Sequence, residues 1–255
     1  MTEPAETPLF EALRERGFQI AFLAHAEAIL SFEFRDSMTA LEGALLDFSI
    51  PVSEIIAGGG GEAKGTQRLR NALSALGWRK TKFKVEKRIN DVPRESQSHE
   101  VDHVLTFSSG VALALEIEWN NKDPFFDRDL ENFKRLHADG AISVGFIVTR
   151  GAALHDSLVL AVRRFCDEQA IDGFDDLVRW GVAPTARQRD QILGRAQRVK
   201  NPLPFRDAFA EHFVSDKFGE ATTHWRKLED RVRRGVGSPC PLVLIGLPPS
   251  IITFD

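Results

Sequence analysis

The sequence predicts an α/β fold, mixed α and β, in which a central mixed β-sheet is flanked by helices. Three patterns predict it: an alternating hairpin over residues 99–119, a helical pattern directly after it, and the apolar run Ala141–Thr149. A strand that is apolar throughout is typical of a sheet interior covered on both faces. A hairpin beside such a strand makes the sheet mixed. With 255 residues, 43% of them hydrophobic, the chain can bury one sizeable core, so we expect a single compact domain.

The N-terminal part, residues 1–57, reads as a helical flank. Apolar residues from Phe18 to Leu30 recur at helical spacing, and Ser37 is a candidate cap for a second helix that contains Leu41 and Leu45. The run Gly58–Gly61 breaks regular structure, and a helix is predicted over about Lys64–Leu76. The glycine run lacks the Lys-Ser/Thr pair of a nucleotide-binding loop, so we expect no nucleotide cofactor.

Residues 58–180 form the predicted core, and its centre is an acidic hairpin. His99–Phe107 alternates as one strand, a Ser-Ser-Gly turn follows, and Val111–Trp119 returns. If Phe107 pairs with Val111, Asp102 lies opposite Glu116, and Glu118 follows on the same face. The other face carries residues such as His103 and Leu105 and is a core face. Phe83–Ile89 is a plausible edge strand, and Asn90–Ser98 a polar connection with Pro93.

Like charges on one sheet face require a compensating cation. No Lys or Arg occurs from Val101 through Asn121, so a hard divalent ion such as Mg²⁺ is the simplest source of positive charge. Small neighbours on this face, Val104, Thr106, Ala112 and Ala114, would let a substrate backbone approach. This is the skeleton of a metal-dependent phosphodiesterase site. A solvated acidic sheet face without a metal is the alternative interpretation.

The remaining elements follow in order along the chain. Asp123 is a candidate cap, with Pro124 at the first position, for a helix that ends near Ala138. A helix over about Leu154–Ala170 follows the buried strand. Residues 181–255 form a basic, proline-punctuated region that we expect to pack on the core. Its predicted elements are helices near Thr185–Arg198 and Thr222–Arg234 and a strand over Leu242–Ile245.

Charge and composition bound the class of protein. The net charge of −4 argues mildly against nucleic-acid binding, but cations are clustered in the segments Arg79–Arg88, Arg187–Arg206 and Arg226–Arg234. Basic walls beside an acidic floor are typical of a nuclease cleft. The chain shows no secretory signal and no apolar run long enough for a membrane span, so we expect a soluble, intracellular protein. Two distant cysteines agree with a reducing compartment.

The acidic arrangement resembles the PD-(D/E)XK nuclease superfamily. Asp102 matches its first acidic position and Glu116 the second, while Glu118 stands where the motif usually has Lys. The stretch EIEWNNKDPFF from Glu116 and the loop GGGGEAKGTQRLR from Gly58 resemble the BglII/BamHI group of type II restriction endonucleases, which shows an acidic residue in that third position. The resemblance is strongest from about Gly58 to Arg150 and implies a restriction-endonuclease-like core.

The resemblance also implies the site residues. Asp102, Glu116 and Glu118 would be catalytic, with Asp102, Glu116 and Ile117 at the metal and Glu118 as general base or holding the attacking water. One or two Mg²⁺ ions would bind per active site. Glu62, Glu86 and Lys122 are weaker additional candidates. The candidates for DNA contact are Asn120, Asn121, Lys122, Arg187, Arg189, Arg195 and Arg198.

The function implied is that of a cytoplasmic, prokaryotic restriction enzyme. We expect a Mg²⁺-dependent type II endonuclease that cuts double-stranded DNA at a short palindrome as a homodimer, because two copies of one site cut two symmetric strands. One alternative keeps the fold: a repair, junction-resolving or modification-dependent nuclease. Another is a DNA-binding protein without catalysis, which predicts salt-dependent binding and no turnover with Mg²⁺.

Overall fold

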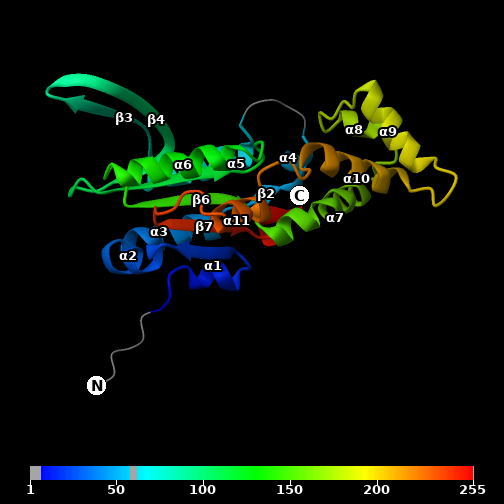
Figure 1. Cartoon of the computed structure of the whole chain (residues 1–255). Coiled ribbons are helices and arrows are strands. Elements are labelled where there is room, and N and C mark those ends of the chain that lie inside the picture. Colours follow the sequence, from blue (N-terminus) through cyan, green and yellow to red (C-terminus); the bar gives the residue numbers. More distant parts are fainter. Residues whose placement is uncertain (1–6, 58–61, 255) are drawn as a thin grey trace.

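The computed structural model describes residues 7–57 and 62–254, and its centre is a six-stranded mixed sheet in the order β1-β7-β6-β5-β4-β3 (Figure 1). Neighbouring strands β5, β6 and β7 run parallel, and the other pairs are antiparallel. The predicted mixed sheet is therefore confirmed. The predicted loop Gly58–Gly61 lies outside the described residues. The strands are β1 (Gln19–Leu23), β3 (Arg79–Ile89), β4 (Val92–Thr106), β5 (Ala112–Glu118), β6 (Val144–Arg150) and β7 (Leu242–Leu247).

Helices cover both faces of this sheet. On one face α6 (Phe125–Ala138) and α11 (Trp225–Arg233) pack on Ala112 and Ala114 of β5, and the other face of β5, with Leu113 and Leu115, belongs to the second core cluster. That cluster also includes α3 (Arg35–Leu46), α5 (Lys64–Ala75) and α7 (Ala152–Glu168). Period-two alternation along β5 thus places its two sets of side chains in two separate cores.

Short elements complete the described ranges. Strands β2 and β8 form a separate parallel pair. None of the helices in residues 7–57 and 62–254 is long and apolar enough to cross a bilayer. The remaining elements are α1 (Glu11–Glu15), α2 (Ala26–Glu33), β2 (Ile50–Pro51), α4 (Val52–Ile56), α8 (Phe174–Val178), α9 (Ala186–Ala196), α10 (Phe205–Lys217), the 3₁₀ helix Pro249–Ile251 and β8 (Ile252–Thr253).

The register predicted for the acidic hairpin is confirmed. His103 pairs with Leu115 and Leu105 with Leu113 in the β4–β5 ladder. The ladder closes where the Phe107 N–H donates to the Val111 carbonyl, 2.9 Å away. Since register fixes which face each side chain takes, the acidic residues of β5 lie on the α6 side of the sheet.

Two predictions for the N-terminal flank are wrong. Residues 19–23 are not helical but form the edge strand β1, which pairs antiparallel with β7 through partners such as Gln19 and Gly246. This distant pairing overrides the local helical spacing. Ser37 is not a cap either, because α3 begins at Arg35 after Phe34 and its cap has no side-chain hydrogen bond. Strands from both flanks, β1 and β7, therefore lie in the central sheet.

The predicted connection Asn90–Ser98 is also wrong, because these residues continue a long hairpin of β3 and β4. Asn90 and Asp91 take positive φ angles of 50° and 63°, which a two-residue turn that matches strand twist requires. Pro93 is tolerated because β4 pairs with β5 only from His103 onward, which leaves Pro93 a single partner strand. The hairpin projects from the body at the end opposite α8 and α9 (Figure 1).

Helix α6 begins later than predicted, and its contact with the sheet is close. Its N-cap is Pro124 rather than Asp123, whose carboxylate instead pairs with Arg231 at 3.3 Å. In β6 a glycine faces the helix: a Cβ added at Gly145 would lie 2.5 Å from the Phe133 ring. Residue 145 must therefore lack a side chain for α6 to reach this position.

We predict that Gly145→Ala lowers stability by about 1 to 3 kcal/mol, because the added methyl group meets a ring that is fully buried. The matched control is Gly43→Ala in α3, where nothing lies within 4 Å of the added Cβ and helix propensity favours alanine by up to about 1 kcal/mol. Thermal unfolding of both variants measures this. Equal melting temperatures for the two would contradict the close packing of α6.

Candidate active site

Four carboxylates gather where β4, β5 and α6 meet. Asp102 lies on β4, and its main-chain N–H is 3.3 Å from Glu116 Oε1 on β5. Glu118 lies two residues farther along the same face of β5. Glu116 is 6% exposed and Glu118 3%, whereas Asp102 is open to solvent. The structure therefore brings together the three acidic residues that the sequence singled out.

The fourth carboxylate, Asp129, was not predicted. It lies on α6, it is 2% exposed, and it shares the Arg128 guanidinium with Glu118. A sequence signal for it exists: Asp129 falls on the apolar stripe of the helix, three residues after Phe126 and next to Leu130. A lone acid on the buried stripe of an amphipathic helix is an exception that points to a site.

Two cations reach this cluster from neighbouring elements. Lys80 of β3 lies 3.4 Å from Asp102 and 2.7 Å from Glu100. Arg128 of α6 lies 2.8 Å from Asp129 and 3.7 Å from Glu118. Chain folding therefore supplies two cations from outside residues 101–121, so the lack of Lys and Arg within that segment does not by itself require a metal.

These two cations do not keep the buried acids ionised. Burial, followed by the charge of Asp129, raises the pKa of Glu116 to about 9 and that of Glu118 to about 8. Burial also raises the pKa of Asp129. At neutral pH Glu116 and Glu118 therefore hold protons unless further positive charge arrives.

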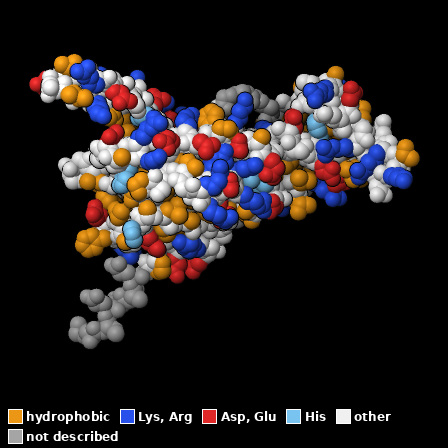
Figure 2. All heavy atoms as spheres, in the orientation of Figure 1, with side chains coloured by type: hydrophobic (Ala, Val, Ile, Leu, Met, Phe, Trp, Pro, Cys, Tyr) orange, Lys and Arg blue, Asp and Glu red, His pale blue; other side chains and the backbone are white. Residues whose placement is uncertain are grey.

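The small residues beside the acids suggested an open face that a substrate backbone could approach. The structure shows instead that α6 covers this face. Ala112 and Ala114 are small because α6 packs on them, and Val104 belongs to the same core. A cavity of about 1080 Å³ reaches the edge of the cluster: it is lined by Asp102, Ile117, Asn120 and Asn121, whereas the buried Glu116, Glu118 and Asp129 are not among its lining residues. Cations from several elements also line it: Lys64, Arg70, Lys80, Arg179 and Lys217. Figure 2 shows Lys and Arg side chains on the projecting hairpin and at the α8–α9 end, mixed with acidic ones.

The residues directly after β5 hold the end of the site in place. The Asn121 side-chain amide donates to Glu118 Oε2 at 2.7 Å, and the Asn120 amide donates to the Lys217 carbonyl at 3.0 Å. Lys122 is exposed and forms an isolated bridge with Thr222. These contacts give Asn121 a direct role in orienting Glu118, beyond the DNA contact expected from the sequence.

Glu62 and Glu86, the weaker acidic candidates, lie in different parts of the structure. Glu62 lines the cavity but is paired with Arg70 at 2.8 Å. Glu86 lies on the projecting hairpin, opposite Ser96, which is six residues before Asp102 on β4. Six residues of extended strand span about 20 Å. The structure therefore brings Glu62 to the cavity and leaves Glu86 outside the acidic cluster.

The four candidate arginines of the C-terminal region belong to α9 and the segment after it. Arg189 lies over the Phe174 ring at 5.0 Å, Arg195 pairs with Glu211 at 3.2 Å, and Arg187 and Arg198 are exposed. None of them is among the described residues that line the large cavity. Their contact with DNA stays a prediction.

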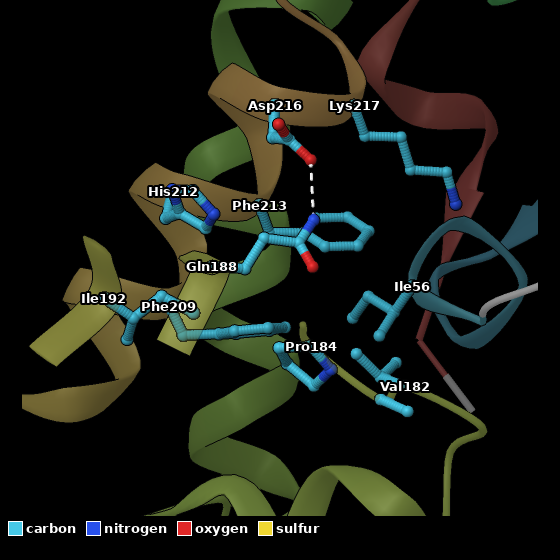
Figure 3. Close-up of a pocket in the computed structure, with 11 residues that line it drawn as sticks. Ile56, Val182, Pro184, Gln188, Ile192, Phe209, His212, Phe213, Asp216 and Lys217 are labelled. Atoms are coloured by element: carbon cyan, nitrogen blue, oxygen red, sulfur yellow. Dashed lines mark hydrogen bonds between the residues drawn. The ribbon is translucent and has the colours of Figure 1, made fainter. Parts of the chain in front are cut away.

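A smaller cavity of about 280 Å³ lies between α9 and α10 (Figure 3). Its walls are mostly apolar, and Gln188 donates to Asp216 across it at 2.9 Å. Gln188 also caps α9 by accepting from the Thr185 N–H at 2.9 Å. Lys217 lines both cavities. We therefore assign this cavity to the packing of α9 beside the larger cavity rather than to catalysis.

Histidines supply no better metal site. His103 is buried with Nδ1 3.2 Å from the Leu115 carbonyl, as expected for a structural residue. His155, Glu220 and His224 form another possible ligand group. The two imidazole rings, however, stack at 4.1 Å, and the Arg150 guanidinium lies 3.4 Å from His155 Nδ1. Because the rings are nearly parallel, their nitrogens point in parallel directions instead of converging on one point. The Arg150 guanidinium beside them also repels a cation.

The acidic cluster fits a hard divalent cation. Its donors are carboxylate oxygens, the ligands that Mg²⁺ prefers over imidazole. Buried carboxyl groups with raised pKa values supply a physical need for added positive charge. Ile117 has an apolar side chain, so its main-chain oxygen is the atom it could offer.

A comparison with family models identifies the family of the chain. The family model described as restriction endonuclease BglII/BglIII matches residues 18–247, which is most of the chain. Among the curated proteins, the search found no match.

We predict that the metal-free protein loses stability as pH rises from about 4.5 toward 8. In this interval the unfolded chain releases the Glu118 proton while the folded chain retains it, because the folded pKa is about 8 against an ordinary 4.5. Glu118→Gln removes this difference, so its melting temperature in EDTA should fall less than that of the wild type. A change of 1 kcal/mol corresponds to about 2 to 4 °C. Parallel pH profiles for the two proteins would show that Glu118 carries no raised pKa.

Proposed function

Since the chain belongs to the restriction endonuclease BglII/BglIII family, and is thus a type II site-specific deoxyribonuclease, we propose that it cleaves DNA with Mg²⁺ at the cluster of Asp102, Glu116 and Glu118. The observation that carries the assignment is the gathering of these acids on one sheet face, where the Asp102 main-chain N–H donates to Glu116 Oε1 and Asp102 itself lines a large cavity that cations also line. Such a cavity suits a phosphodiester backbone that must approach Asp102.

Each residue has a distinct task in this proposal. Asp102 and Glu116, with the main-chain oxygen of Ile117, would hold Mg²⁺. The bound ion supplies neutralisation of phosphate charge and polarisation of the linkage that breaks. Glu118 is the general base that accepts a proton from the attacking water. The hydrogen bond from Asn121 to Glu118 Oε2, at 2.7 Å, fixes the carboxylate so that its other oxygen carries the proton.

The third motif position is acidic here, so phosphate charge needs a cation from elsewhere. Lys122 was the candidate from sequence. Lys80 has better support, because it lines the cavity and lies 3.4 Å from Asp102, whereas Lys122 is not among the described residues that line it. We therefore assign phosphate contact in the site to Lys80.

Cutting both strands of a palindromic site requires two active sites related by two-fold symmetry. Each chain offers one acidic cluster. We therefore propose that two copies bind one short palindrome, each cutting one strand of the double-stranded DNA.

We predict that the purified protein with Mg²⁺ cuts plasmid DNA into discrete fragments and that Glu118→Gln lowers the cleavage rate at least about 100-fold, because the base is lost. DNA binding should remain within a few fold, since one buried carboxyl group is replaced by an amide of the same shape. The matched control is Glu131→Gln, an exposed residue of α6 that pairs with Lys134. Absence of discrete fragments from unmodified DNA of varied sequence would refute the proposal.

Mixed dimers test the two-fold arrangement. We predict that wild-type protein mixed with excess Glu118→Gln protein nicks supercoiled plasmid instead of linearising it, because each duplex then meets one functional site. Gel electrophoresis separates nicked from linear products. If the mixture gave linear plasmid in proportion to wild-type protein alone, one chain would be cutting both strands.

A further inference from the structure

The Asp129 carboxyl group has no task in the proposed chemistry, yet it lies inside the acidic cluster. Its Oδ1 accepts from Arg128 Nε and lies near Nη2, both at 2.8 Å. In the part of the chain that the structure describes, Oδ2 is buried without a hydrogen-bond partner. The side chain is 1% exposed. Leaving a buried acceptor unsatisfied costs about 1 to 3 kcal/mol, so this oxygen is expected to have a partner.

The Asp129 carboxyl group faces another acceptor. Arg128 Nη2 lies 2.8 Å from Asp129 Oδ1 and 3.7 Å from Glu118 Oε1, so helix α6 places the two carboxyl groups beside each other. Two ionised carboxylates in contact repel each other unless a proton or a metal cation lies between them. Asn121 donates to Glu118 Oε2, and no donor among the described residues reaches Asp129 Oδ2. The Asp129–Glu118 pair therefore needs a proton or a further cation when both groups are ionised.

The ion pairs around these acids show that positive charge is lacking. Asp102, Glu116, Glu118 and Asp129 are four acids, and among the described contacts only Lys80 and Arg128 form ion pairs with them. Lys80 is moreover shared with Glu100, which lies closer to it, at 2.7 Å against 3.4 Å for Asp102. The cations are therefore fewer than the acids, and a divalent cation would reduce the difference.

We propose that Asp129 is a metal ligand, and that its Oδ2 atom binds the divalent cation of the acidic cluster beside the Glu118 carboxylate. The proposal rests on the proposed function and deepens it, because it adds a ligand from α6 to those that the sheet provides. The ligands are oxygens, so the cation belongs to the Mg²⁺ and Mn²⁺ class. A ligand fixed on a helix packed against β5 and β6 holds its position rigidly.

Arg128 provides the positive charge next to Asp129 and Glu118. Its guanidinium pairs with Asp129 and stacks over the Phe125 ring at 4.3 Å, and its side chain is 53% exposed. When a divalent cation takes over the neutralisation of Asp129, this exposed guanidinium becomes available to a DNA phosphate. Metal binding and phosphate contact are thereby linked through one side chain.

The test measures Mn²⁺ binding to the full chain without DNA, by isothermal titration calorimetry and by the electron paramagnetic resonance signal of free Mn²⁺. Asp129→Asn is expected to bind Mn²⁺ at least about 10-fold more weakly than the wild type, or to bind one ion fewer. The matched control is Asp127→Asn on the same helix, whose carboxylate pairs with Arg231 at 2.8 Å outside the cluster. It should bind Mn²⁺ as the wild type does.

A second readout separates ligation from a structural role. Without metal, Asp129→Asn should still unfold in one cooperative transition, because the amide oxygen can accept from Arg128 and the amide NH₂ group can donate to Glu118. The rise in melting temperature that Mn²⁺ causes in the wild type should shrink in the variant. If Asp129→Asn does not fold, the smaller Asp129→Ser variant is measured in the same way.

Wild-type affinity and ion number in Asp129→Asn would overturn the inference, as would an equal loss in Asp127→Asn or no Mn²⁺ binding by the wild type. Glu116→Gln separates this failure from that of the proposed function. If Glu116→Gln loses Mn²⁺ binding and Asp129→Asn does not, the active site stands and Asp129 is not a ligand. If both bind Mn²⁺ normally and the wild type cuts no DNA, the proposed function fails as well.

Discussion

The contact between buried carboxyl groups beneath α6 is the constraint on which the rest of the site depends. Glu116 and Glu118 project from the one face of β5 that the helix covers, and Asp129 projects from the helix toward them. Burial removes the solvent that would otherwise separate like charges, so the pKa of Glu116 rises to about 9 and that of Glu118 to about 8. Acids held in this way favour a bound cation, and the Mg²⁺ ion that we propose at this site would also neutralise phosphate charge.

The fold places the site accurately because the end of β5 is tied to distant segments. Buried Arg150, at the end of β6, donates to the Trp119 carbonyl at 2.9 Å and to the Thr223 carbonyl at 2.7 Å. The Thr223 N–H donates to the Asn121 carbonyl at 2.8 Å, and the Asn121 side chain reaches Glu118. This chain of contacts joins β6, the loop before α11 and the proposed general base. The guanidinium is held by carbonyl oxygens rather than by a buried acid. Burial lowers the pKa of Arg150 to about 9.

The sequence predicted what depends on local periodicity. The alternation of the acidic hairpin specified its register, and with it the shared face of Asp102, Glu116 and Glu118, while the apolar run of β6 specified a central strand. It missed what depends on distant partners. Strand β1 exists because Gln19 pairs with Gly246, and Lys80 reaches Asp102 across a ladder that contains a register shift. Asp129 joins the cluster through helix packing, which spacing along the strands does not encode.

The net charge of −4 does not predict the local charge around the large cavity, where we propose that DNA binds. Lys64, Arg70 and Lys80, which come from two different elements, all line the large cavity together with Asp102. Phosphate groups respond to charge within about one Debye length, roughly 8 Å in physiological salt, so charges that line a cavity matter more to a bound phosphate than the sum over the chain. An acidic chain can in this way bind a polyanion without a basic surface overall.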